Sequence, residues 1–234
     1  EIVAKAMKLA RTEKPGAVHI ELAENIAAET TDATPLRPAN PRRAVPDDTI
    51  MDQVWDRIRQ ARSPLIIAGN GTIRTRASKQ LRRFCDATNI GVLMSFMGKG
   101  AVDLDAEYCL FTIGMGQRDY PLLAVESADL IITLGFDMVE YPPSSWNGNG
   151  DTDIIHIAHA LWMLNQRIKS DGAPQFELNK QAAVRQTMLA EFAEHADDDT
   201  RGSIRPQKAV ADIRKVLGPD DILLSGVGAH KMWI

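Results

Sequence analysis

Four short segments that are almost entirely apolar constrain the fold more than any other feature of the sequence. Longer segments with helical patterns separate them, and they are Leu65–Ala68, Gly91–Met94, Leu130–Leu134 and Ile154–Ile157. A strand that is apolar on both sides must be buried on both faces, and such strands alternating with helices are typical of parallel sheets. The sequence therefore predicts an α/β fold, a doubly wound parallel sheet with helices on both faces.

The segments between these strands carry helix signals. Asp47 or Asp48 is placed to cap a helix that continues to about Ala61, with an apolar inner face made of Ile50, Val54, Trp55 and Ile58. Further helices are predicted over about Arg76–Thr88, Asp119–Ser127, parts of 160–195, and the region from Pro206 to Leu217.

The two ends of the chain differ from this alternating middle. Glu1–Arg11 has a helical pattern without a capping residue, and Ala17–Leu22 alternates like a strand with one buried face. Residues 30–48 are rich in Thr and Pro and have the character of an extended linker. Ile222–Leu224 has the pattern of a strand that runs into a glycine turn. These interrupted patterns predict that the chain begins and ends inside neighbouring domains.

Composition excludes several classes of function. The formal net charge is −4, so no basic surplus points to nucleic acid. No apolar run approaches the length that spans a bilayer, and no charged-then-apolar leader begins the chain. We therefore expect a cytoplasmic protein without nucleic-acid or membrane partners. Cys85 and Cys109 lack metal-type spacing, which favours two buried thiols over a disulfide or a ligand pair.

Three candidate sites lie at turns where sheets of this kind bind ligands. Gly69-Asn70-Gly71 directly follows a strand, and its glycines let a phosphate approach backbone N–H groups, although a plain tight turn is the simpler interpretation. Gly114 and Gly116 precede a predicted helix, where they either bind a nucleotide or help to cap that helix. Asp137 follows a buried strand and either contacts a ribose or adenine or caps a turn.

The last glycine turn differs from these three because a histidine follows it. Ser225-Gly226-Val227-Gly228 ends a predicted strand, and His230 comes two residues later. Glycines and the N-terminus of the incoming helix form a cradle for a diphosphate, with the imidazole as an added donor. His19 and His156 lie on predicted strands without a recognisable partner, and we interpret them as core or rim residues. No hydrolase, zinc-protease or Walker motif occurs.

Four segments, taken in order, carry a family resemblance. They are Gly-Asn-Gly-Thr-Ile-Arg (69–74), Phe-Met-Gly-Lys-Gly-Ala-Val (96–102), Gly-Phe-Asp-Met-Val-Glu-Tyr (135–141) with Trp146-Asn147, and Gly-Val-Gly-Ala-His-Lys-Met-Trp (226–233). Together they resemble the large subunits of acetolactate synthases, which depend on thiamine diphosphate. The resemblance covers nearly the whole chain. It implies the end of a pyrimidine-binding domain at 1–30, a linker at 31–48, a central Rossmann-like domain at 49–195 and the start of a diphosphate-binding domain at 204–234.

The resemblance also implies an activity. The parent enzyme would condense two pyruvates to 2-acetolactate with loss of CO₂, using thiamine diphosphate and Mg²⁺, as a homodimer or homotetramer in branched-chain amino acid or acetoin metabolism. Gly228 and His230 would contact the diphosphate. The family's catalytic glutamate would precede Glu1 and its Gly-Asp-Gly metal motif would follow Ile234, so we expect the chain alone to be inactive. Two rival interpretations are a nucleotide-binding module and a structural domain that positions the two catalytic domains.

Two departures from the family pattern bear on these expectations. Gly135 precedes Phe136 where flavin-binding members have an arginine, and Gly116 follows Met115 where they have His-Gly. Both differences argue against tight binding of FAD and agree with the flavin-independent branch. In addition, a predicted helix follows Ile157-Ala158 at once, where the family has a further strand. Because loss of a buried strand would expose the sheet edge, we favour residues missing from the sequence over a true deletion.

Overall fold

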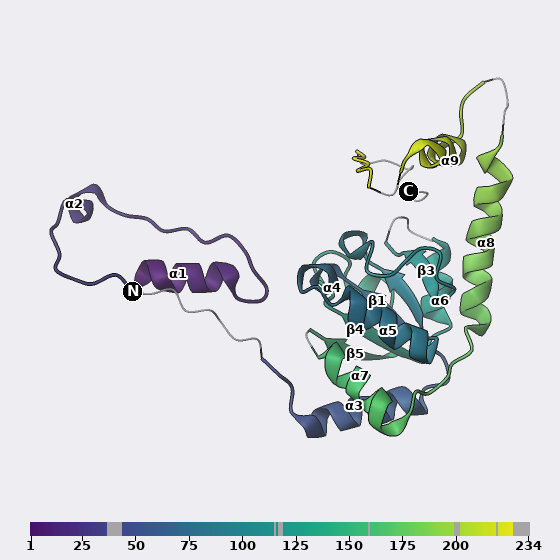
Figure 1. Ribbon diagram of the computed structural model, residues 1–234, viewed down its shortest axis with the longest axis horizontal. Helices are drawn as coiled ribbons and strands as arrows, with labels where there is room; N and C mark the ends of the chain where they lie inside the picture. Colours follow the sequence, from purple (N-terminus) through teal and green to yellow (C-terminus); the bar gives the residue numbers. More distant parts are fainter. Residues whose placement is uncertain are drawn as a thin grey trace. The chain divides into compact units, whose positions relative to one another are not determined.

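Four of the predicted strands and one further strand lie side by side in one five-stranded parallel sheet (Figure 1). In the order in which they pair, the strands are β3 (Cys109–Thr112), β2 (Gly91–Met94), β1 (Pro64–Ala68), β4 (Leu130–Leu134) and β5 (Asp153–Ile157). Every residue of β1, β2 and β4 is buried, as expected for strands that are covered on both faces. The predicted α/β fold with a parallel sheet is therefore confirmed.

The computed structural model describes residues 1–36, 44–114, 116, 119–158, 160–198, 202–218 and 220–226. The chain divides into two units, Glu1–Val45 and Pro46–Ile234. The first unit holds α1 (Ile2–Arg11) and the short α2 (Glu24–Ala27), and Ala6 is the one buried residue among its described residues. The second unit contains the sheet.

Helices cover both faces of the sheet. On one face, α3 (Asp48–Gln60), α5 (Ser78–Thr88) and α7 (Leu161–Asp171) pack against side chains that include Ile66 of β1. On the other face, α6 (Tyr120–Glu126) and α8 (Asn179–Ala196) bury Leu65 and Ile67 of the same strand. Successive side chains of a strand point to opposite faces, so the continuous apolar pattern of β1 supplies both cores. The doubly wound arrangement follows from this.

The helix signals of the sequence correspond to the observed boundaries. Helix α3 begins where predicted, because the carboxylate of Asp47 accepts a hydrogen bond from the amide of Thr49 at 2.8 Å. That hydrogen bond also lowers the pKa of the Asp47 carboxyl. Helix α5 ends at Asn89, which adopts a left-handed conformation. The remaining short elements and the last helix are α4 (Asn70–Arg74), η1 (Phe96–Gly98), η2 (Pro143–Ser145) and α9 (Pro206–Val216).

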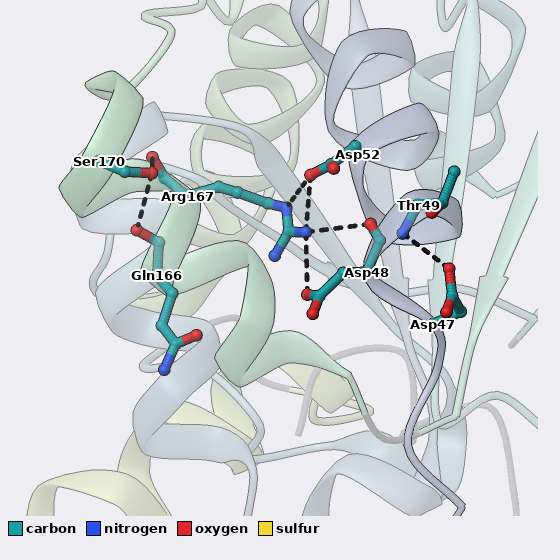
Figure 2. A network of polar contacts seen from close by, with 7 residues as sticks. All are labelled: Asp47, Asp48, Thr49, Asp52, Gln166, Arg167 and Ser170. Atoms are coloured by element: carbon teal, nitrogen blue, oxygen red, sulfur yellow. Dashed lines mark hydrogen bonds and ion pairs between the residues drawn. The ribbon is translucent and has the colours of Figure 1, made fainter.

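One arginine ties α7 to the start of α3 (Figure 2). The guanidinium of Arg167 donates to one carboxylate oxygen of Asp52 from Nε at 2.9 Å and from Nη2 at 2.7 Å. Nη2 also donates to the backbone carbonyl and the carboxylate of Asp48, at 3.1 and 3.3 Å. The Arg167 side chain is 12% exposed although both carboxylates face solvent. Its planar fork therefore holds two helices that are far apart in the sequence.

Two predicted strands are wrong, and one strand was not predicted. Ala17–Leu22 and Ile222–Leu224 form no strand in the described chain, and most of their side chains are exposed. An alternating or apolar pattern makes a strand only when a neighbour supplies hydrogen bonds, and neither segment pairs with the sheet. Conversely, Cys109–Thr112 carries a weak pattern, yet pairing with β2 makes it a strand.

Other expectations from composition can be checked directly. Cys85 and Cys109 are both free and buried, as predicted, and burial raises the pKa of each thiol. In the described part of the chain, no helix combines the length and apolarity needed to cross a bilayer. The four-part division of the chain stays a prediction.

We predict that Arg167→Lys lowers the free energy of unfolding by about 1 kcal/mol, because a lysine ammonium cannot reproduce the fork that binds Asp48 and Asp52. Urea unfolding followed by circular dichroism measures this change. Arg57→Lys is the matched control, because Arg57 makes a single solvent-exposed pair with Asp153. Equal effects of the two substitutions would contradict a special role for Arg167.

Candidate functional site

The order of the strands places the expected ligand crevice between β1 and β4. From β1 the sheet extends through β2 to β3 on one side, and through β4 to β5 on the other. In doubly wound sheets, ligands bind beyond the carboxyl ends of the strands at this reversal. Gly69-Asn70-Gly71 follows β1 and Gly135-Phe136-Asp137 follows β4, so these two predicted turns are brought together there.

The two turns bind each other through their backbones. The amide of Gly69 donates to the carbonyl of Leu134 at 2.9 Å, and the amide of Gly71 donates to the carbonyl of Gly135 at 2.8 Å. The hydroxyl of Thr72 donates to the Leu134 carbonyl as well, at 2.9 Å. The N–H groups that would hold a phosphate at Gly69 and Gly71 are thus already used within the protein. This geometry favours the tight-turn interpretation of these two glycines.

The approach of the two turns leaves no room for side chains. A Cβ atom at Gly71 would lie 2.6 Å from the Cα of Gly135, and one at Gly69 would lie 2.5 Å from the Cα of Phe136. Gly135 has a φ of +54°, a conformation that glycine adopts readily. Glycine is therefore required on both sides of the contact for steric reasons.

Glu140 ties the loop after β4 to the loop after β2. One of its carboxylate oxygens accepts from the amide of Met97 at 2.6 Å, and the other accepts from the hydroxyl of Ser95 at 3.0 Å. Ser95 is completely buried, so its hydroxyl needs a partner inside the protein. No sequence pattern indicates this role of Glu140, because its partners lie more than 40 residues away along the chain.

Aromatic side chains pack together in the loop after β4. Trp146 is buried, its ring lies 6.0 Å from the ring of Phe136 in an edge-to-face arrangement, and its Nε1–H donates to the Tyr141 carbonyl at 3.2 Å. The Tyr141 ring lies beside Gly114, 3.2 Å from where a Cβ atom would be. Asp137 accepts from the amide of Val139 at 3.0 Å, as a turn-capping aspartate does.

A comparison with known families decides the classification. The sequence model of a family described as "Thiamine pyrophosphate enzyme, central domain" matches residues 51–178, more than half of the chain. The chain belongs to this family. The matched residues run from α3 to the segment before α8, and the five-stranded parallel sheet lies within them.

Known relatives agree with this membership. The chain is 26% identical over 173 residues to "Acetolactate synthase" of Bacillus subtilis, covering 73% of this chain and 30% of the relative. It is 26% identical over 264 residues to "Acetolactate synthase large subunit" of Parasynechococcus marenigrum, covering 99% and 42%. The protein with the same description from Corynebacterium glutamicum is 24% identical over 259 residues, covering 100% and 41%. The chain thus spans less than half the length of these relatives.

The lengths of these matches concern the expectation that residues are missing from the sequence between Ile157 and Ala158. The match to the Parasynechococcus protein runs over 264 residues, whereas the whole chain has 234. That relative therefore has more residues within the matched span than the sequence of this chain has. In the structure, β5 ends at Ile157 and α7 begins at Leu161, so only a short connection follows the strand.

Asn70 and Asp137 belong to the two turns at the crevice, whereas other predicted site residues lie elsewhere or outside the described residues. Gly228 and His230, the predicted diphosphate contacts of this family member, lie outside the described residues. Gly116 is exposed and Asn70 is half-buried; ligand binding by Asn70, Gly114, Gly116 and Asp137 stays a prediction. Within the described ranges, no three His, Cys, Asp or Glu side chains are grouped to hold a metal ion.

A surface cleft of about 210 Å³ lies elsewhere in the central domain. Its walls come from α5 and α7, and the residues that line it are Gln80, Arg83, Trp162, Asn165, Gln166 and Lys169. None of the residues after β1 or β4 lines this cleft. The cleft is therefore separate from the crevice that the fold predicts.

We predict that Gly71→Ala destabilises this central domain by about 3 kcal/mol, because the added methyl group meets backbone atoms that cannot move aside. Gly202→Ala is the control: nothing lies within 4 Å of its Cβ position, so its effect should stay within about 0.5 kcal/mol. Thermal and urea unfolding of both variants measure the difference. A Gly71→Ala protein as stable as the control variant would show that the two turns do not pack closely.

Proposed function

We propose that this chain is the central part of an acetolactate synthase-like enzyme that condenses two pyruvates to 2-acetolactate and releases CO₂. The observation that carries the proposal is the match to the central-domain family, supported by acetolactate synthase relatives over 99% and 100% of the chain. Thiamine diphosphate, Mg²⁺, a cytoplasmic location and assembly as a homodimer or homotetramer belong to the same proposal.

Within that enzyme, we assign the described part of the chain a structural role. The turns after β1 and β4 bind each other, and Glu140 fastens the loop after β2 to the loop after β4. A domain whose crevice is closed by its own backbone is suited to hold two neighbouring domains at a fixed separation. This geometry supports the scaffold interpretation more than a nucleotide-binding module. It also agrees with the expectation that FAD is not tightly bound.

The chemistry of the reaction belongs to other parts of the enzyme. Thiamine diphosphate, when bound, supplies the electron sink for cleavage of the bond to the carboxylate of a 2-oxo acid. The residues of this chain proposed to hold its diphosphate, Gly228 and His230, lie outside the described residues. Because the family resemblance implies a catalytic glutamate and a metal motif that this sequence does not contain, residues 1–234 by themselves are proposed to be inactive.

We predict that residues 1–234, supplied with pyruvate, thiamine diphosphate and Mg²⁺, form no 2-acetolactate. The polypeptide that carries this sequence together with both neighbouring domains should form it, because only that polypeptide contains the catalytic glutamate and the metal motif. Conversion of the product to acetoin by acid, followed by a colorimetric assay, measures both samples. If the longer protein folds, binds thiamine diphosphate and consumes pyruvate but releases only acetaldehyde, the proposed condensation is wrong.

A further inference from the structure

The sequence contains three asparagines that are each followed by glycine, at Asn70-Gly71, Asn147-Gly148 and Asn149-Gly150. In such a pair the backbone nitrogen of the glycine attacks the side-chain amide carbon of the asparagine, because glycine has no side chain to hinder the approach and its backbone turns readily. A folded protein allows this attack only where the side chain is free and the backbone has room to move. The structure therefore distinguishes the three pairs.

The first pair is protected by the close packing of the two turns at the crevice. The attacking nitrogen would be that of Gly71, whose N–H donates to the carbonyl of Gly135 at 2.8 Å. A Cβ atom at Gly71 would lie 2.6 Å from the Cα of Gly135, so the backbone has no room to turn. Asn70 itself is half-buried. Reaction at this pair requires the turns after β1 and β4 to separate.

The second pair is protected by the hydrogen bonds of its own side chain. Nδ2 of Asn147 donates to the carbonyl of Thr152 at 2.9 Å, and Oδ1 of Asn147 accepts from the amide of Thr152 at 3.3 Å. The backbone amide of Asn147 also donates to the carbonyl of Pro143 at 2.7 Å. Attack by the nitrogen of Gly148 would therefore require both side-chain hydrogen bonds to break.

The third pair has neither kind of protection. Asn149 and Gly150 are both exposed, and among the described residues the Asn149 side chain has no hydrogen-bond partner. Nothing lies within 4 Å of the Cβ position of Gly150, so its backbone has room to turn. The amide of Gly150 donates to the Asn147 carbonyl at 3.0 Å, but this hydrogen bond lies in an exposed turn, where water replaces the lost acceptor.

The base of this turn stays fixed when its tip opens. The two hydrogen bonds between Asn147 and Thr152 close residues 147–152 into a small loop. Trp146, just before the loop, is buried, and β5 begins at Asp153, just after it. A change of backbone conformation at the tip therefore leaves both anchors in place, so local opening is easier here than at the packed turns of the crevice.

We propose that Asn149 is a site of spontaneous deamidation. The nitrogen of Gly150 loses its proton and bonds to Cγ of Asn149, the bond from Cγ to Nδ2 breaks, and ammonia leaves with the proton. Water then opens the cyclic succinimide at either carbonyl, which gives aspartate or isoaspartate at position 149. The product adds one negative charge, next to the exposed Asp151 and Asp153, to a chain whose formal net charge is −4. This reaction is independent of the proposed function.

Incubation of the folded 234-residue chain at mildly alkaline pH tests the proposal. Fragmentation mass spectrometry places the modification at a single residue and distinguishes isoaspartate from aspartate. Asn149 should react at least about tenfold faster than Asn70 or Asn147, because only its pair reacts without the loss of packing or of side-chain hydrogen bonds. In the urea-unfolded chain the three pairs should react at similar rates, because the difference between them comes from the fold.

Two matched variants complete the test. Asn149→Gln should abolish the fast reaction, because glutamine would have to form a larger ring, and the exposed position should tolerate the change. Asn147→Gln removes the neighbouring pair of the same loop and should leave the reaction at Asn149 in place. The proposal is overturned if Asn70 or Asn147 reacts as fast as Asn149 in the folded chain. It is also overturned if the folded chain stays unmodified at Asn149 while the unfolded chain reacts there.

Discussion

The contact on which the rest of the central domain depends is the packing of two backbone turns against each other at the carboxyl ends of β1 and β4. Gly69 and Gly71 on one side and Gly135 on the other approach so closely that no side chain fits between them. Their amides and carbonyls bond across the contact, so few of the donors that usually hold a phosphate at this point are left for a ligand. The place where a doubly wound sheet ordinarily binds a ligand is used here to join strands.

Contacts around the two turns reinforce their packing. Glu140 binds the loop after β2, and Trp146 packs against Phe136 and bonds to the Tyr141 carbonyl. Away from the strand ends, Arg167 joins α7 to α3. These contacts fasten the domain at its strand ends and across its helices, as the proposed scaffold role requires.

The features that depend on local pattern could be predicted from the sequence, and those that depend on distant partners could not. The apolar runs of the sequence predict β1, β2, β4 and β5, although one side of β5 is exposed at Ile154 and His156, and the capping Asp47 predicts α3. Among the described residues, no strand pairs with Ile222–Leu224 despite its strand pattern, whereas Cys109–Thr112 is a strand because it pairs with β2. The role of Glu140 depends on contacts across 43 and 45 residues, which no spacing rule reveals.

The backbones of Gly69, Gly71 and Gly135 close the crevice between β1 and β4, and we propose on this ground that the domain holds no nucleotide there. Isothermal titration of the chain with ADP tests this statement most directly. We predict no heat beyond dilution at ADP concentrations up to about 1 mM. Saturable binding with a dissociation constant below about 100 µM, weakened by Asn70→Ala, would contradict it and restore the nucleotide-binding interpretation.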